Sequence, residues 1–169
     1  MENTLLTERL ILRPFIESDI DPLFKIQSDT DAMKYTFAAQ NREESAANLV
    51  GHANQLQVIG YAPWTVCSRE NGRVIGWGGL LEDPFEPGYG TEVAYFFGME
   101  HWGNGYATEV VAESVDYGFN TLRLDSIGAF ARGDNLGSIR VLTKCGFNYV
   151  NYNEALCRNY YEISRRMKR

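Results

Sequence analysis

Two glycines separated by one residue stand directly before a helical pattern, in the stretch HWGNGYATEVVAESVDYGF from His101 to Phe119. A strand that leads into a glycine-rich turn and then a helix presents free backbone N–H groups at the positive end of the helix dipole, which favours anion binding. Gly103 and Gly105 would let the backbone approach a ligand closely, and Ala107 keeps the first helical turn small. The spacing predicts a phosphate-binding loop, with a plain tight turn as the alternative.

The glycine loop does not match the two commonest phosphate-binding motifs. Gly-x-Gly-x-Ala lacks the lysine and the Ser/Thr of a P-loop, and it lacks the third glycine of a dinucleotide fingerprint. The missing lysine also argues against a phosphate-transferring enzyme such as a small kinase.

The segment after the loop has one apolar face at helical spacing. At about 100° per residue, this face holds Ala107, Val110, Val111, Ser114, Val115 and Gly118. The opposite side holds Glu109, Glu113, Asp116 and Asn120. We therefore expect Glu109 to face solvent and not to act in catalysis.

Length and composition predict one domain, residues 1–169, with a real hydrophobic core. The net charge of −6 gives no attraction to nucleic acid or to anionic lipid. Three cysteines at wide spacings match neither a disulfide framework nor a zinc site, so we expect reduced thiols and no metal. With no apolar run long enough to cross a bilayer and no leader pattern, we expect no membrane association and a cytoplasmic location.

The elements alternate in type along the chain. Strands are predicted at residues 9–15, the first being an edge strand, and at 61–69, 73–81, 91–97, 125–132, 147–153 and 158–167. Helices are predicted from a cap at Ser18 to about residue 28, over 42–57, after the glycine loop, and over 135–145. Because a helix joins strands 91–97 and 125–132, these two can lie parallel. The sequence predicts an α/β or α+β fold on a mixed sheet.

Three blocks in order along nearly the whole chain resemble the GNAT N-acetyltransferases, in particular the branch of the ribosomal-protein N-terminal acetyltransferases. Trp102 to Glu109 (WGNGYATE) looks like the acetyl-CoA pyrophosphate loop of that branch. The segment 135–147 resembles its Asn-x-x-Ser block ending in Lys-x-Gly-Phe, and residues 6–14 resemble its opening Thr-Glu-Arg-Leu strand. The resemblance implies a central, mostly antiparallel sheet with a splayed parallel pair and flanking helices.

The resemblance also implies where acetyl-CoA would bind. The pantetheine arm would enter between the splayed strands and pair with the backbone of the first, at Tyr95, Phe96 and Phe97. The pyrophosphate would sit on the amides of Gly103, Asn104, Gly105, Tyr106, Ala107 and Thr108. Asn135 would contact the pantetheine arm, although an asparagine there is also a good helix N-cap.

Acetyl transfer by direct attack needs a base for the amine and a proton donor for the thiolate. For the base we favour Glu92, which matches the acidic residue at the head of this strand in the family branch. Glu82 and Asp83 are the alternatives, and Glu92 could also be a plain exposed carboxylate at a strand end. Period-2 alternation places Glu92 on one face with Ala94 and Phe96, opposite Val93, Tyr95 and Phe97.

The proton donor departs from the commoner family pattern, because Leu142 occupies the usual tyrosine position. The resemblance implies Ser138 as the proton donor instead. The alternative is that the Ser138 hydroxyl only forms a local hydrogen bond with the backbone of its helix. Cys145 is interpreted as a packing residue, since direct transfer needs no covalent intermediate.

The acceptor should be a primary amine, either a protein N-terminus or a small molecule. An α-amine with a pKa near 7.8 costs only about 0.5 kcal/mol to deprotonate at pH 7.4, whereas a lysine costs about 4 kcal/mol. A pocket for a cationic amine with an apolar body is predicted from Tyr35, Phe37, Glu82, Asp83, Phe85 and Glu86. The rival function is a CoA-binding sensor or partner module without catalysis, and a homodimer is compatible with the family.

Overall fold

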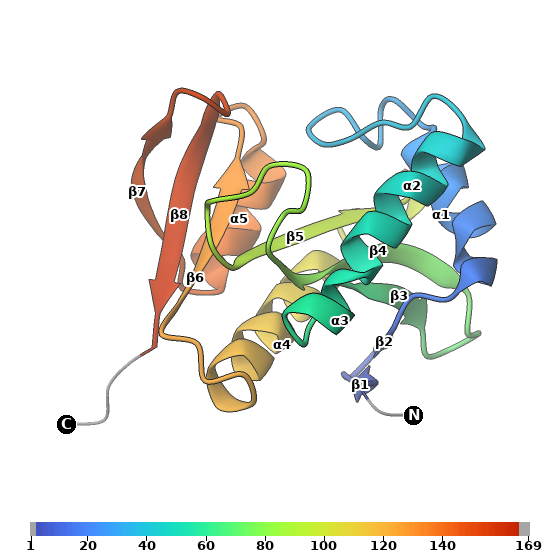
Figure 1. Cartoon of the computed structure of the whole chain (residues 1–169), viewed down its shortest axis with the longest axis horizontal. Helices are drawn as coiled ribbons and strands as arrows, with labels where there is room; N and C mark the ends of the chain where they lie inside the picture. The colour runs from blue at the N-terminus through green and yellow to red at the C-terminus, as the bar shows by residue number, and fades with distance from the viewer. Residues whose placement is uncertain (1–2, 166–169) are drawn as a thin grey trace.

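One eight-stranded mixed sheet forms the centre of the computed structural model, which describes residues 3–165 (Figure 1). In sheet order the strands are β1 (Leu5–Leu6), β2 (Leu10–Arg13), β3 (Trp64–Ser68), β4 (Val74–Leu81), β5 (Glu92–Phe97), β6 (Ser126–Ala131), β8 (Arg158–Ser164) and β7 (Asn148–Asn153). The α-helices are α1 (Ile20–Gln27), α2 (Arg42–Ala53), α3 (Gln55–Val58), α4 (Tyr106–Asn120) and α5 (Leu136–Lys144).

The strand pairing confirms the predicted mixed sheet. β5 and β6 run parallel, and the other neighbouring strands in the described residues pair antiparallel. In Figure 1 the β6–β8–β7 half stands apart from the β1–β4 half, and β5 lies between them. The helix that connects the parallel pair is α4, as the chain order predicted.

Three predicted details were wrong. The edge of the sheet is β1, which pairs outside β2 and is too short to leave a periodic signal. Ser18 does not cap a helix, because it lies inside a single 3-10 turn, Glu17–Asp19, that precedes α1. The helix predicted over 42–57 is interrupted at Asn54, where α2 ends and α3 begins. The predicted end of the last strand, Met167, lies outside the described residues.

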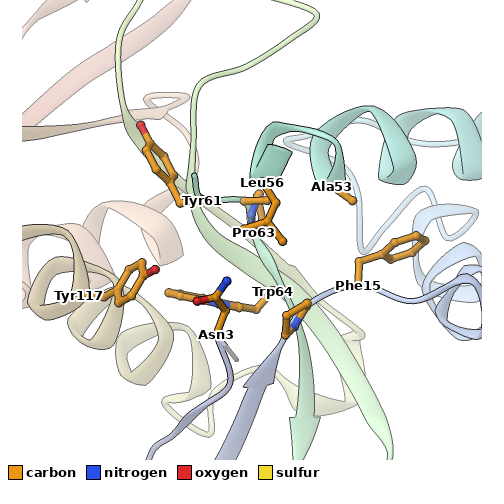
Figure 2. A pocket seen from close by; sticks show the side chains of 10 residues that line it. Asn3, Phe15, Ala53, Leu56, Tyr61, Pro63, Trp64 and Tyr117 are labelled. Atoms are coloured by element: carbon orange, nitrogen blue, oxygen red, sulfur yellow. The ribbon is translucent and has the colours of Figure 1, made fainter. Parts of the chain in front are cut away.

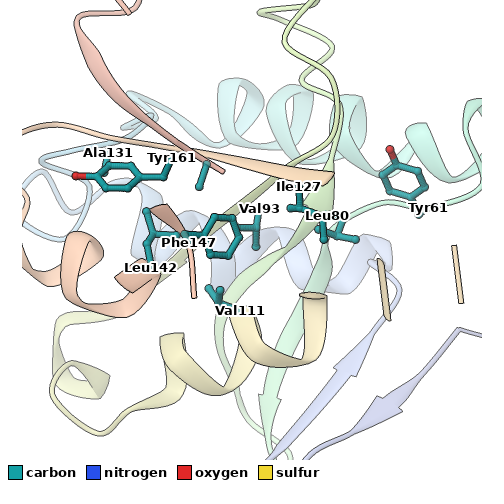
Figure 3. Close-up of a cluster of buried hydrophobic side chains, with 10 residues drawn as sticks. Tyr61, Leu80, Val93, Val111, Ile127, Ala131, Leu142, Phe147 and Tyr161 are labelled. Atoms are coloured by element: carbon teal, nitrogen blue, oxygen red, sulfur yellow. The ribbon is translucent and has the colours of Figure 1, made fainter. Parts of the chain in front are cut away.

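The alternation along β5 separates the two faces of the sheet as predicted. Val93 and Tyr95 pack with α4 and α5 in the larger core, and Figure 3 shows Val93 beside Val111, Leu142 and Phe147. Phe96 and Ala94 belong instead to the core on the α1 and α2 side. Glu92 shares the face of Ala94 and Phe96, so the two faces carry different parts of the candidate site.

The apolar face of α4 packs closely on the sheet. Val110, Val111 and Ser114 are fully buried, each at 0% exposure. A Cβ at Gly118 would come within 2.7 Å of Ile127 Cδ1, so a larger residue there would push the helix away from β6. This packing fixes the amino end of α4, where the glycine loop arrives.

A buried carboxylate anchors the start of α1 to the sheet. Asp19 is 2% exposed; its carboxylate accepts two hydrogen bonds of 2.7 Å from the Arg13 guanidinium, one from Thr65 Oγ1 and one from the Ile16 N–H. Burial alone raises the pKa of Asp19, but these hydrogen bonds outweigh it and hold the pKa below the usual value.

We expect Asp19→Asn to lower the free energy of unfolding at pH 7 by about 3 kcal/mol, because it leaves the Arg13 guanidinium without its partner. Since the folded pKa is depressed, this stabilisation is present above the ordinary aspartate pKa and is lost as the pH falls through the folded pKa. Urea unfolding at pH 7 and at acid pH measures both effects. The control Asp21→Asn removes an exposed ion pair with Arg42 and should leave the free energy of unfolding almost unchanged. Equal losses in the two variants would contradict the anchoring role of Asp19.

Candidate active site

The glycine loop has the backbone conformation that its glycines predict. Gly103 and Gly105 both have positive φ, 74° and 82°, a region that side chains disfavour. Gly105 is the N-cap of α4, and no side chain caps the helix there. The first N–H groups of α4 are therefore left for water or a ligand. This is the geometry of an anion site at a helix amino end.

Contacts within the protein hold the loop in shape. Trp102 Nε1 donates to the Phe97 carbonyl at 3.0 Å, which ties the loop to the end of β5. Arg9 donates to the Asn104 carbonyl at 2.8 Å, and its guanidinium lies 4.7 Å from the centre of the Tyr106 ring. The glycine loop is thus held in shape by a residue from the opening block of the chain, a contact that no local sequence pattern indicated.

Glu109 does not face solvent, which corrects the prediction. Its side chain is only 14% exposed, and its carboxylate accepts hydrogen bonds from the Thr7 hydroxyl and from both the backbone N–H and the guanidinium of Arg9. The helical period placed Glu109 correctly on the side of α4 away from the sheet core, but residues 7–9 cross that side. Its contacts attach the amino-terminal segment to α4.

The parallel strands β5 and β6 meet at one point. In the described residues their only register pair is Glu92 with Gly128, joined by a hydrogen bond of 2.9 Å from the Gly128 N–H to the Thr91 carbonyl. Beyond Glu92, the backbone of β5 pairs with β4 alone. The side of β5 that faces β6 therefore has no strand partner along Tyr95, Phe96 and Phe97, although the Phe97 carbonyl is already occupied by Trp102 Nε1.

Glu92 stands where these two strands meet. Burial raises its pKa to about 7, and the neighbouring negative charges of Asp83 and Glu86 add to the rise, while Arg158 opposes it. A carboxylate with a pKa near 7 accepts a proton at neutral pH far more readily than an ordinary glutamate. Glu92 is thus not a plain exposed strand-end carboxylate.

The two alternative bases have other partners. The Asp83 carboxylate accepts from the backbone N–H groups of Phe85 and Glu86, so it stabilises the turn that follows β4. Glu82 receives a long hydrogen bond of 3.5 Å from the Tyr61 hydroxyl. Both lie in the loop that arches in front of β5 in Figure 1 (green).

Ser138 and Asn135 lie together at the start of α5. Asn135 is the N-cap, and its Oδ1 accepts from the Ser138 N–H at 3.1 Å. The Ser138 hydroxyl is not satisfied by backbone; its oxygen accepts from Asn135 Nδ2 at 3.2 Å and from the Tyr95 hydroxyl at 3.1 Å. The sequence predicted only a backbone role for Tyr95, so the contact of its side chain is new.

Leu142 and Cys145 are packing residues in the structure. Leu142 is 2% exposed and lies in the core with Phe147 and Tyr161 (Figure 3). Cys145 packs against the same core, burial raises the pKa of its thiol, and its Sγ contacts the Thr108 carbonyl at 3.6 Å. A raised pKa disfavours the thiolate form that a nucleophile needs.

Two groups of aromatic side chains lie on the elements that surround β5. On the α2 side, the ring of the buried His52 meets Trp77 and Phe85 edge to face, and Trp77 stacks on Phe96. On the β8 side, the rings of Tyr89, Phe130 and Tyr160 form a second contiguous group. The sequence pattern indicated Phe85 but not His52, Phe130 or Tyr160. These three residues come from α2, β6 and β8, which are distant from Glu92 in the sequence.

The remaining predicted acceptor residues, Tyr35, Phe37 and Glu86, lie in two different segments. The Tyr35 hydroxyl donates to the Asp134 carbonyl at 3.3 Å, so the segment between α1 and α2 reaches the loop before α5. Phe37 lies in the same segment and is exposed. Glu86 forms an ion pair of 3.6 Å with Arg158 on β8.

Two cavities lie outside the surroundings of Glu92. A small one, about 40 Å³, lies between the start of β3, the end of α2 and α4, with Tyr61, Trp64 and Tyr117 in its lining (Figure 2). A wider one of about 620 Å³ borders the glycine loop at His101 and Tyr106 and extends to Lys25 and Arg73. Neither contains Glu92 or Ser138.

The comparison with protein families decides the family. Residues 9–148 match the acetyltransferase (GNAT) domain model, which covers more than half of the chain. The chain belongs to the GNAT acetyltransferase family. The resemblance in the glycine loop, the opening strand and the α5 segment is therefore confirmed, and acetyl-CoA is the donor substrate of this family.

Similar proteins agree with this assignment. An uncharacterised N-acetyltransferase, p20 of Bacillus licheniformis, is 34% identical over 166 residues, 97% of this chain and 90% of its own. The acetyltransferase of Agrobacterium tumefaciens C58 has the same fold, with a TM-score of 0.84 and 21% identity over 98% of this chain and 96% of its own. RimJ of Mycobacterium smegmatis, solved with CoA-disulfide, has a TM-score of 0.73 and 18% identity over 92% and 81%. No helix among residues 3–165 of this GNAT protein has the length and hydropathy of a membrane span.

Proposed function

We propose that this GNAT protein transfers the acetyl group of acetyl-CoA to a cationic primary amine, a peptide N-terminus or a small-molecule amine, by direct attack in a ternary complex. The observation that carries the proposal is the position of Glu92, a carboxylate with a pKa of about 7 at the single point where β5 and β6 meet. In this proposal the donor arm lies along β5 and its pyrophosphate on the loop 103–108.

Glu92 takes the proton of the amine, and the protein supplies mainly positioning for the rest of the reaction. The backbone of Tyr95, Phe96 and Phe97 and the amide of Asn135 hold the pantetheine arm. The hydroxyl of Ser138 donates a hydrogen bond to the sulfur as the carbon–sulfur bond breaks. Cys145 takes no part.

The acceptor side is the face of the sheet that carries Glu92, Ala94 and Phe96. The two aromatic groups on the elements around β5 would supply apolar walls, and Glu82, Asp83 and Glu86 would supply negative charge toward a cation. These features favour an amine with an apolar body over a highly charged acceptor. A homodimer stays a prediction.

A thiol-release screen over amines, N-terminal peptides and aminoglycosides tests the proposal, with acetyl-CoA binding measured by calorimetry on the same sample. We expect binding of acetyl-CoA and release of CoA that depends on one class of amine. Binding with no release for any amine would contradict the transferase and support the CoA-binding sensor, a function that the missing tyrosine at Leu142 favours.

Removing the three loop acids, by Glu82→Gln, Asp83→Asn and Glu86→Gln together, should raise KM for a cationic acceptor at least about 5-fold and leave KM for acetyl-CoA within about 2-fold. Asparagine at 83 keeps an oxygen for the turn. Because Asp83 and Glu86 raise the Glu92 pKa, the pH midpoint of kcat should also move to lower pH. Steady-state kinetics against pH measures both.

The matched control for the loop acids is Glu113→Gln with Asp116→Asn, which removes two charges from α4 on the side away from the sheet core. It should change neither KM. Equal changes of KM for acceptor and donor in the loop variant would show that these acids do not face the acceptor.

A further inference from the structure

The Ser138 oxygen has both of its acceptor positions filled by neighbouring side chains. A hydroxyl has one donor proton and two acceptor lone pairs. Tyr95 Oη donates to Ser138 Oγ at 3.1 Å, and Asn135 Nδ2 donates at 3.2 Å. The amide orientation of Asn135 is fixed, because its Oδ1 already accepts the Ser138 N–H at 3.1 Å. The only hydrogen-bonding capacity that Ser138 retains is its own proton.

The two donors come from opposite arms of the parallel pair. Tyr95 belongs to β5, whereas Asn135 and Ser138 belong to the loop and helix that follow β6. The Tyr95–Ser138 hydrogen bond therefore connects β5 with α5, beyond the one register pair that β5 and β6 share. Ser138 is half-buried, and its hydroxyl donates no hydrogen bond to any of residues 3–165.

From this geometry we propose that Tyr95 is a positioning residue that directs the Ser138 proton toward the sulfur of CoA. The inference rests on the proposed acetyl transfer and adds a residue to it. As the carbon–sulfur bond breaks, the electron pair stays on sulfur, and the Ser138 O–H donates a hydrogen bond to the developing thiolate. Ser138 and Tyr95 keep their protons, and the proton lost by the amine leaves through Glu92.

The environment of Tyr95 suits this role. Burial raises the pKa of Tyr95 to about 12, so its phenol stays protonated and remains a donor across the working pH range. The ring packs against the core around Val93. Tyr95 on β5 thus stabilises the departing thiolate through its hydrogen bond to Ser138. Leu142 is a buried apolar residue and has no proton to donate to the thiolate.

The test compares Tyr95→Phe, Ser138→Ala, the double variant and the wild type. Tyr95→Phe keeps the ring and removes one hydrogen bond, so kcat should fall about 10-fold while KM for acetyl-CoA stays within about 2-fold. The double variant should be no slower than Ser138→Ala alone, because both act on one group. The proposal would be overturned if Tyr95→Phe kept kcat within about 2-fold of wild type or changed only KM. It would also be overturned if the fall in kcat caused by Tyr95→Phe added to that of Ser138→Ala in the double variant.

A second measurement needs no acceptor. The ultraviolet absorbance of the thiolate, followed against pH in the complex with CoA, gives the pKa of the bound thiol. Tyr95→Phe and Ser138→Ala should each raise this pKa by about 0.5 to 1, and an unchanged pKa would overturn the role of Tyr95. Failure of the wild type to bind CoA would instead contradict the proposed function itself.

Tyr117→Phe is the matched control, since Tyr117 is another partly buried tyrosine whose ring packs edge to face on Trp64 at 5.5 Å. It lies on α4 away from Ser138 and should leave both kcat and the pKa of the bound thiol unchanged. Effects equal to those of Tyr95→Phe would assign the loss to packing and overturn the proposal.

Discussion

Replacing Glu92 by glutamine should lower kcat by about 10²- to 10³-fold at pH 7.5, with KM for acetyl-CoA little changed. Glutamine has nearly the same shape but cannot accept the proton of the attacking amine. The effect should be the largest of any single side chain in the site, because Glu92 combines the raised pKa with the position at the meeting of β5 and β6.

The pH dependence makes the Glu92 prediction specific. A general base acts in its deprotonated form, so wild-type kcat should rise with pH through about 7 and then level off. In Glu92→Gln this step should disappear, and the residual rate should rise at higher pH as solvent supplies free amine. The loss should be smaller for an α-amine than for a lysine-like amine, whose deprotonation costs about 4 kcal/mol at pH 7.4.

Glu113→Gln is the control for the charge change, since Glu113 lies on α4 on the side away from the sheet core. It should retain wild-type kcat. A Glu92→Gln variant that keeps both its rate and its pH step would eliminate Glu92 as the base and return Glu82 and Asp83 to consideration.

Gly103→Ala should weaken acetyl-CoA binding by about 10- to 100-fold. Gly103 has φ of 74°, and a Cβ added there would have no protein atom within 4 Å, so the new methyl group would project into the space on the open side of the loop. It would hinder close approach of the pyrophosphate, and backbone strain would turn the neighbouring N–H groups away from it. Calorimetric titration of acetyl-CoA measures the dissociation constant.

The hairpin turn at residues 69–73 offers a control with nearly the same backbone. Gly72 has φ of 70° and also has no atom within 4 Å of an added Cβ, so Gly72→Ala should lose a similar amount of stability, about 1 kcal/mol, without changing the dissociation constant. Equal affinity in the two alanine variants would show that the glycine loop does not hold the pyrophosphate.

Most elements of the fold were predictable because they have a local signal in the sequence. The glycine loop, the apolar face of α4 and the alternation along β5 depend on neighbouring residues, so helical and strand periods predicted them. The two-residue strand β1 has no such period. Glu109 shows the limit of periodicity, since a period identifies the side of a helix but not the distant segment that crosses it.

The site was predictable only in part, because several of its contacts join residues that are far apart in the sequence. Glu92 and Ser138 were predicted from the resemblance to the family branch, and their catalytic roles stay predictions. Burial raises the pKa of Glu92 most, the charges of Asp83 and Glu86 in the preceding loop raise it further, and Arg158 in β8 opposes the rise. The hydrogen bond from Tyr95 to Ser138 joins residues 43 positions apart, and no local pattern predicts such a contact.

The most direct test of acetyl transfer to an amine is to count both products of one reaction with isotopically labelled acetyl-CoA. We expect one acetylated amine for each CoA thiol released, with no label on the protein, because the amine attacks the thioester directly. Label on Cys145, or thiol release without acetylated amine, would contradict transfer by direct attack in a ternary complex.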